Sequence, residues 1–323
     1  MTPHESIQIL QKRMNAYIIG QENIVERLII GLLANGNLLV EGLPGLAKTR
    51  AVRAMADAIE SEFSRIQFTP DLLPSDVTGS ENMYEEGGKY KFRFEEGPIF
   101  GNIILADEIN RAPAKVQAAM LEAMEERQVT VAGKTHKLPK LFIVMATQNP
   151  VEQEGTYPLP EAQKDRFLMH VNITYPDKAS EIEVIKLVRG ERSGTNQEEN
   201  VEEIPQEMIF SARDEIASVK TSPTVEQYIV DLVFATRYPE KYDEKLASYI
   251  DIGVSPRASL ALDQCSRVYA WLQGRDFTTP EDVRAVMHDI FRHRITASYT
   301  AQSERISNDD ITELILQLVA LPA

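Results

Sequence analysis

Apolar side chains near the N-terminus recur at the three- and four-residue spacing of an amphipathic helix. A separate helix starts before this stripe, because Thr2, Pro3 and Glu5 supply an N-cap, a first-turn proline and the glutamate of a capping box. The pattern therefore predicts two helices ahead of the first strand. The stripe of the second helix consists of Ile24, Val25, Leu28, Ile29, Leu32 and Leu33.

Between residues 37 and 173 short apolar runs alternate with amphipathic stretches. The short runs are typical of buried strands and the amphipathic stretches of helices. Such alternation predicts an α/β fold, in which helices flank a mainly parallel sheet. The expected strands are residues 37–41, 64–68, 102–107, 141–147 and 168–173, and the expected helices are residues 48–60, 113–127 and 160–166.

Two stretches inside this region alternate apolar and polar residues around a turn. Residues 79–96 contain a Glu-Gly-Gly turn, and residues 129–138 turn at Gly133-Lys134. Each pattern predicts a β-hairpin. A hairpin that projects from an α/β core can grip a partner or only extend the structure, and the sequence favours neither alternative.

The pattern changes after residue 177, where helical stripes recur and strand patterns end. The change predicts an α/β domain over residues 1–176 and an all-helical domain over residues 177–323. Residues 191–203 are rich in glutamate and small polar residues, which is typical of an exposed loop. The helices expected beyond this loop are residues 206–219, 224–237, 256–273, 280–291 and 308–319.

A loop rich in glycine follows the first apolar strand and ends in Lys48 and Thr49, at the start of a helix. Such a loop turns backbone N–H groups toward a phosphate, and the dipole of the helix favours negative charge there. Lys48 is expected to neutralise the β- and γ-phosphates of a nucleotide, and the Thr49 hydroxyl is expected to bind Mg²⁺. The strict pattern has glycine where this chain has Ala47, so an ordinary turn before a helix is the alternative. The expected nucleotide-binding residues of the loop are Gly42, Leu43, Pro44, Gly45, Leu46, Ala47, Lys48 and Thr49.

A second motif supports the nucleotide interpretation. The apolar run over residues 102–106 ends in two carboxylates, Asp107 and Glu108. Ligands of open α/β sheets bind at the carboxyl ends of the strands, which is where this pair is expected to lie. Asp107 would hold Mg²⁺ through water, and Glu108 would act as general base toward the attacking water. A solvated turn after a buried strand is the alternative for this pair alone.

Charge and cysteine content narrow the function classes. The 323 residues carry a formal net charge of −15, which argues against a protein that binds nucleic acid through a generally basic surface, although a local basic pore is compatible with it. Cys265 is the only cysteine, so neither an intrachain disulfide nor a cysteine zinc site is possible. His288 and His293 are expected on different faces of one helix, which favours surface or packing roles.

The sequence contains no apolar run of the ~18–20 residues that a membrane span needs. Its N-terminus has a helix-start pattern in place of the charged and apolar regions of a signal peptide. We therefore expect a cytoplasmic protein without a membrane span.

The phosphate loop, the Asp-Glu strand end and the helical C-terminal region together resemble the AAA+ ATPases. A further stretch, Thr147-Gln148-Asn149-Pro150, resembles the sensor-1 position of that family. The resemblance implies that Asn149 orients the attacking water or contacts the γ-phosphate. It also implies ATP and Mg²⁺ as cofactors, and a helical lid as the second domain.

Two arginines extend the resemblance. Arg166 lies in the run 160–167, which is similar to the arginine-finger segment, and the resemblance implies that it reaches the γ-phosphate bound by a neighbouring subunit. Arg257 lies in the run 253–258, which is similar to sensor 2 and implies contact with the same phosphate from within the subunit. A surface arginine and a first-turn salt bridge are the alternatives. An arginine in the first turn opposes the helix dipole, which favours a separate task for Arg257.

Two longer runs, residues 67–76 and 157–163, resemble the MoxR branch of the AAA+ proteins. The segment that includes Ile19 and Gly20 is similar to the family segment that lies against adenine. The resemblance implies a homo-oligomeric ring, expected to be a hexamer, with both hairpins at its central pore.

The resemblance also implies a function: ATP hydrolysis that remodels or activates protein partners. Members of this branch act as chaperones, often with partners that carry von Willebrand factor A domains, and some support metal or cofactor insertion. Nucleic acid is not an expected partner. A chelatase-type motor subunit, a DNA-acting motor and a nucleotide-gated scaffold remain as alternatives. The combination of Asp107, Glu108, Asn149 and Arg166 argues against the scaffold, because a scaffold needs neither a base nor a finger.

Overall fold

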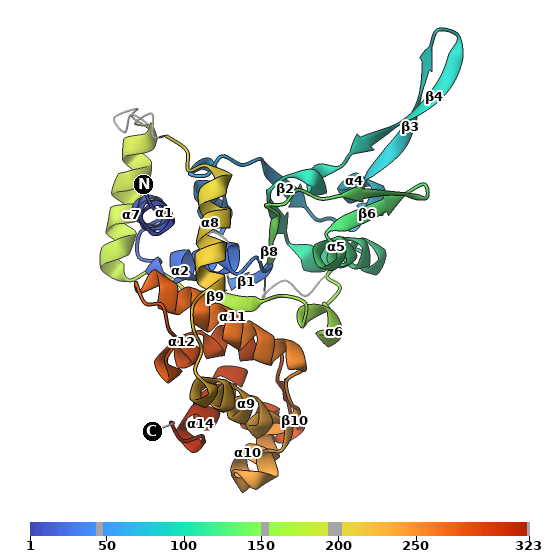
Figure 1. The fold of residues 1–323 in the computed structure, drawn as a ribbon. Helices are drawn as coiled ribbons and strands as arrows, with labels where there is room; N and C mark the ends of the chain where they lie inside the picture. Colours follow the sequence, from blue (N-terminus) through green and yellow to red (C-terminus); the bar gives the residue numbers. More distant parts are fainter. Residues whose placement is uncertain (43–47, 150–154, 193–201, 322–323) are drawn as a thin grey trace. The chain divides into compact units, whose positions relative to one another are not determined.

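A computed structural model of the chain describes residues 1–42, 48–149, 155–192 and 202–321 (Figure 1). The chain folds as two compact units. Unit 1 comprises residues 1–29, 37–159 and 172–208. Unit 2 comprises residues 30–36, 160–171 and 209–323.

A five-stranded sheet with the order β2-β5-β8-β1-β9 confirms the expected α/β fold. The neighbours β2 and β5, β5 and β8, and β8 and β1 all run parallel. The first four residues of β5 and the first five of β8 are buried, as their continuous apolar runs require for strands covered on both faces. The strands are β1 (Leu38–Gly42), β2 (Phe63–Gln67), β5 (Ile103–Asp107), β8 (Ile143–Gln148) and β9 (Met169–Ile173).

Helices flank this sheet, and two of them illustrate how local sequence starts a helix. The first begins with the predicted capping box, in which the Thr2 N–H donates to Glu5 Oε2 at 2.7 Å. A helix after residue 177 was not predicted, although Asp177 caps it by accepting the Ser180 N–H at 2.7 Å. The helices are α1 (Pro3–Tyr17), α2 (Glu22–Leu33), α3 (Lys48–Asp57), α4 (Pro74–Thr78), η1 (Pro98–Phe100), η2 (Ile109–Arg111), α5 (Ala114–Glu126) and α7 (Lys178–Arg192).

Both predicted hairpins are present, and one turns a residue earlier than expected. In the second hairpin Val131 pairs with Lys134, so the turn is Ala132-Gly133 in place of Gly133-Lys134. Both turn residues have positive φ, 49° and 80°, as the tight turn of a two-residue hairpin requires. The hairpins are β3 (Gly79–Glu86) with β4 (Lys89–Glu96), and β6 (Gln128–Val131) with β7 (Lys134–Lys137).

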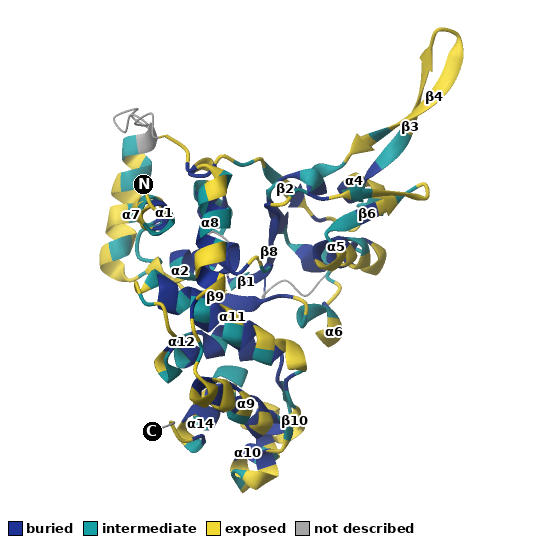
Figure 2. Cartoon of the chain, in the orientation of Figure 1, coloured by how far each residue is buried: buried dark blue, intermediate teal, exposed yellow. Residues whose placement is uncertain are grey.

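Strand β7 of the second hairpin contacts the β3–β4 hairpin near the base of the latter. The rings of Phe94 and His136 stack with their centroids 3.8 Å apart. Lys134 Nζ lies 2.9 Å from Glu81 Oε1. Beyond this junction the β3–β4 hairpin extends away from the sheet, and its outer half is exposed (Figure 2).

The rest of the chain is predominantly helical, with one small departure from the all-helical expectation. Two short strands, β10 (Ile250–Ile252) and β11 (Thr296–Ala297), pair antiparallel. The helix that carries His288 ends at Phe291, so His293 lies beyond it, where it is buried in a packing role. The predicted loop 191–203 falls largely outside the described residues. The helices are α6 (Glu161–Lys164), α8 (Gln206–Ala217), α9 (Pro223–Arg237), η3 (Pro239–Lys241), α10 (Glu244–Tyr249), α11 (Pro256–Leu272), α12 (Pro280–Phe291), α13 (Tyr299–Ser303) and α14 (Asn308–Leu318).

Candidate functional site

The carboxyl edge of the sheet collects the residues that sequence reasoning singled out in unit 1. Gly42 ends β1, Asp107 ends β5, and Asn149 directly follows β8. Because β5, β8 and β1 are parallel neighbours, these three positions meet at the same edge. Asn149 is buried, with 6% of its surface exposed.

Lys48 opens α3 and reaches back to two of these strands. Its ammonium group donates to the carbonyl oxygen of Gly42 at 2.7 Å and of Gln148 at 3.3 Å. Thr49 is the next residue of the helix and is half-buried. Residues 43–47, which include the expected loop residues Leu43 to Ala47, lie outside the described residues.

Gly42 occupies a position with no room for a side chain. A Cβ atom there would lie 2.9 Å from Cβ of Ile173 and 3.0 Å from its carbonyl oxygen. The close approach of β9 therefore requires glycine at the point where β1 enters the loop.

Gly20 is constrained in a similar way, beside the predicted adenine segment. It has a φ of +72°, and a Cβ there would lie 2.4 Å from Ser180. Arg50 donates to the carbonyl oxygen of Tyr17 at 3.0 Å. This hydrogen bond connects the first turn of α3, which also contains Lys48 and Thr49, to the end of α1. Ile19 and Gly20 follow directly, so the structure brings this segment close to the start of α3.

Thr147 connects the two acidic residues. Its buried hydroxyl donates to Asp107 Oδ1 at 2.7 Å and accepts the backbone N–H of Glu108 at 2.9 Å. Glu108 has left-handed backbone angles, φ 58° and ψ 50°, which for a side chain of this type cost about 1–2 kcal/mol. The hydrogen bond that the Glu108 N–H donates to Thr147 helps to hold this strained backbone.

Three further side chains hold the carboxylates, and none was predicted. Arg65 donates to Asp107 Oδ2 at 2.6 Å and to Gln67 Oε1 at 2.8 Å. Gln67 in turn donates to Glu108 Oε2 at 3.0 Å, and Arg111 donates to the same oxygen at 3.1 Å. One sequence feature could have indicated these residues: in β2 the polar Arg65 and Gln67 flank the buried Ile66. Gln67 pairs with Asp107 in the register of β2 and β5.

This arrangement fits a phosphate group with Mg²⁺. It combines an ammonium group, a hydroxyl at a helix start and a carboxylate, which are the donor types that such a pair requires. Asp107 Oδ2 accepts two hydrogen bonds from Arg65, while Oδ1 accepts one from Thr147 and keeps lone-pair capacity for a metal-bound water. Within the described residues no three His, Cys, Asp or Glu side chains gather as a direct metal site.

We expect Thr147→Val to lower the turnover number by about 10- to 100-fold, because it removes the hydrogen-bond partner of Asp107 Oδ1 and of the Glu108 N–H. Nucleotide affinity should change much less, since Lys48 and the loop are untouched. Thr147→Ser is the matched control, because it keeps the hydroxyl. Steady-state kinetics together with nucleotide titration measure both quantities, and a valine variant that turns over like the serine variant contradicts this role.

The two predicted arginines lie in unit 2. Arg166 follows α6 and is exposed. Arg257 is the second residue of α11, its side chain is 46% exposed, and its Nη1 lies 3.4 Å from Asp165 Oδ2. Arg257 therefore contacts the residue that directly precedes Arg166, and both arginines lie in unit 2.

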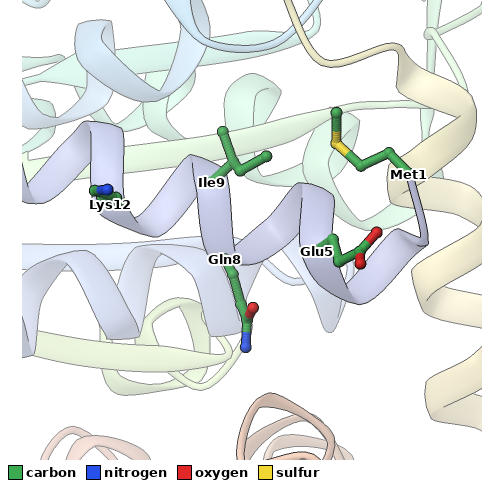
Figure 3. A pocket seen from close by; sticks show the side chains of 5 residues that line it. All are labelled: Met1, Glu5, Gln8, Ile9 and Lys12. Carbon is green, nitrogen blue, oxygen red and sulfur yellow. The ribbon is translucent and has the colours of Figure 1, made fainter.

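Of two hollows in the described structure, one lies away from the motif residues and the other is lined in part by residues of the runs 160–167 and 253–258. One, of about 460 Å³, runs along α1 and is bordered by Met1, Glu5, Gln8, Ile9 and Lys12 (Figure 3). Met1 and side chains of α1 form this hollow. Its polar side chains do not point toward a common centre, as those of a ligand site do. The other, of about 400 Å³, lies beside α6 in unit 2 and is lined largely by polar and charged side chains.

Known proteins are similar to this chain in sequence and in architecture. Residues 37–169 match the family model of the ATPase family associated with various cellular activities (AAA), and residues 245–315 match the AAA lid domain. Chaperone MoxR1 of Mycobacterium tuberculosis is 44% identical over 306 residues, which cover 94% of this chain and 79% of that protein. The chain belongs to the MoxR family of AAA+ ATPases.

Further relatives agree with this membership. Protein MoxR of Paracoccus denitrificans is 31% identical over 94% of this chain and 92% of its own length. A crystal structure of a candidate ATPase from Cytophaga hutchinsonii superimposes with a TM-score of 0.91 at 45% identity, over 99% of this chain and 96% of that one. The MoxR resemblance and the AAA+ fold with a helical lid are thus confirmed. None of the helices that the structure describes combines the length and the apolarity needed to cross a membrane.

Proposed function

We propose that this MoxR-family protein hydrolyses ATP in a ring of identical subunits and uses the reaction to remodel or activate protein partners. The observation that carries the proposal is the meeting of Lys48, Asp107, Glu108 and Asn149 at one edge of the sheet. Thr147 joins the two carboxylates there, so a candidate base and a candidate metal ligand share one rigid support.

The roles of these residues follow from their chemistry. Lys48 binds the β- and γ-phosphates, while Thr49 and Asp107 hold Mg²⁺, the latter through water. The metal, when bound, neutralises charge on the phosphate oxygens. Asn149 orients the attacking water and Glu108 accepts its proton, while the water oxygen bonds to the γ-phosphorus and the bond to the ADP oxygen breaks.

Two arginines supply the remaining positive charge in this proposal. Arg166, which is exposed, acts as a finger on the nucleotide of the next subunit. Arg257 contacts the γ-phosphate of its own subunit. Charge spreads over the γ-phosphoryl oxygens in the transition state, so a guanidinium placed there accelerates the reaction strongly.

The β3–β4 hairpin is the proposed contact with protein partners. Its cross-strand pairing places Met83, Tyr90 and Phe92 on one face, and these side chains are 60%, 69% and 65% exposed. Large apolar side chains gathered on an exposed surface mark interaction sites. Proteins with von Willebrand factor A domains, and enzymes that await a metal or cofactor, are the partner classes that the family membership favours.

The test is the Mg²⁺-dependent ATPase rate per subunit, measured against protein concentration in a cytosol-like buffer. A site completed between subunits predicts a rate that rises with concentration and then saturates as rings form. A rate that is constant from dilute to concentrated protein contradicts the shared site. The Glu108→Gln variant, which lacks the proposed base, serves as the blank. A rate that never exceeds this blank favours the nucleotide-gated scaffold. Stimulation of the rate by DNA favours the DNA-acting alternative.

A further inference from the structure

Asp165 directly precedes Arg166 and is the centre of a polar cluster in unit 2. Its Oδ1 accepts from Arg294 Nε at 2.9 Å and from Ser255 Oγ at 2.9 Å. Ser255 also reaches Oδ2 at 2.9 Å, and Arg257 Nη1 lies 3.4 Å from the same oxygen. One carboxylate therefore links the end of α6 to the start of α11 and to the segment after α12.

The strongest of these contacts is the buried pair with Arg294. The side chain of Arg294 is 2% exposed and that of Asp165 is 17% exposed. Burial lowers the pKa of Arg294, and the charge of Asp165 opposes that shift. A buried guanidinium of this kind needs a carboxylate partner. The buried Arg294 side chain therefore holds the Asp165 carboxylate in place.

Arg294 also holds the backbone on both sides of Arg166. It donates to the carbonyl oxygens of Asp165 at 3.2 Å, Phe167 at 2.6 Å and Leu168 at 3.1 Å. His293 Nε2 lies 3.1 Å from the same Phe167 oxygen. The turn that carries Arg166 is therefore clamped from within its own subunit, while the Arg166 side chain itself is exposed.

We propose that Asp165 is a positioning residue that presents Arg166 to the neighbouring subunit. The inference rests on the proposed function, in which Arg166 acts on the next subunit's nucleotide. Asp165 locks the Arg294 clamp in place, and the clamp fixes the turn from which the finger projects. The contact with Arg257 is secondary, because it is longer and lies where the Arg257 side chain is 46% exposed, so solvent screens it.

The first measurement uses Asp165→Asn, which keeps the shape and removes the charge. A misplacement of about 1 Å lowers catalysis by about 100-fold, so kcat is expected to fall by about that factor. The KM for ATP should stay near the value of the unchanged protein, because the variant's own pocket is intact. Asp263→Asn is the matched control, since Asp263 forms a half-buried pair with Arg267 within α11 and its loss should leave kcat unchanged.

The decisive measurement compares finger donors in mixed rings. Arg166→Ala subunits, which keep their base, are mixed with Glu108→Gln subunits, which keep their finger, and the recovered rate is recorded. The same recipient is then mixed with subunits that carry both Glu108→Gln and Asp165→Asn. Assembly of each mixture is matched by light scattering, and thermal unfolding shows that every donor is folded at the assay temperature.

The double-variant donor is expected to recover at least 10-fold less activity than the Glu108→Gln donor. Equal recovery from both donors overturns the role of Asp165. A donor that carries Glu108→Gln and Asp165→Glu keeps the charge beside Arg294 and is expected to recover more activity than the Asp165→Asn donor. Recovery no better than that of the Asp165→Asn donor counts against a role for the charge. If even the Glu108→Gln donor restores nothing, the finger in the proposed function fails, which separates the two failures.

Discussion

Replacing Glu108 by Gln is expected to lower the ATP turnover number by about 10²–10⁴-fold, the range that a general base contributes. Gln has nearly the same shape and can still accept the hydrogen bonds that Gln67 and Arg111 donate, but it cannot take the proton of the attacking water. ATP should therefore bind as before. Steady-state turnover and titration with a fluorescent nucleotide analogue measure the two quantities on the same preparation.

The matched control for this change is Glu122→Gln, which removes an exposed carboxylate of α5. It should alter neither turnover nor affinity. Normal hydrolysis by Glu108→Gln removes Glu108 as the base. A large loss of nucleotide affinity in the same variant shows instead that its carboxylate serves binding.

Replacing Arg166 by Ala is expected to lower turnover by about 10³–10⁵-fold, which is the range that an arginine finger supplies. The loss should be partly reversed when the variant is mixed with Glu108→Gln subunits, although each protein alone is inactive. In a random equal mixture, roughly a quarter of the interfaces join an intact base to an intact finger, because ring contacts are head-to-tail. The recovered rate should approach that fraction of normal turnover.

Arg189→Ala, which changes an exposed arginine of α7, is the control for loss of charge and should keep full activity. Equal losses in the pure variant and in the mixture mean that Arg166 acts within its own subunit. A small effect of Arg166→Ala leaves it as a surface residue, the alternative that its exposure alone permits.

The inner strands of the central sheet could be predicted, because β5 and β8 are buried over nearly their whole length and stand out as apolar runs. The run that ends at Asp107 is the clearest case, with four consecutive residues fully buried. Helix α7 was missed for the opposite reason. Its residues Ile182 and Ile185 are 49% and 55% exposed, so it shows no apolar stripe that faces a core. Only the cap at Asp177 marks its start.

The candidate site was predictable where neighbours in sequence are neighbours in space. Lys48 with Thr49, and Asp107 with Glu108, each belong to one short motif. Arg65 and Gln67 escaped notice, because their link to the carboxylates depends on β2 lying beside β5, and sequence spacing does not show strand order. Asp165 and Arg294 are 129 positions apart, so no local pattern joins them. The roles of the predicted site residues, and the boundary near residue 177, stay predictions.

The stack of Phe94 on His136 gives the two hairpins a mechanical property. Along the chain, β4 leads into β5, and β7 leads into β8, so each hairpin is an arm attached to a strand whose far end carries Asp107 or Asn149. Such a stack contributes about 0.5–1.5 kcal/mol, and the partly exposed ion pair of Lys134 with Glu81 adds about 1 kcal/mol or less. The junction between the hairpins is therefore only a few times stronger than thermal energy. Under a load on one hairpin we expect the two hairpins to separate from each other first, because each is joined to its strand by the chain itself and to the other hairpin only by these contacts.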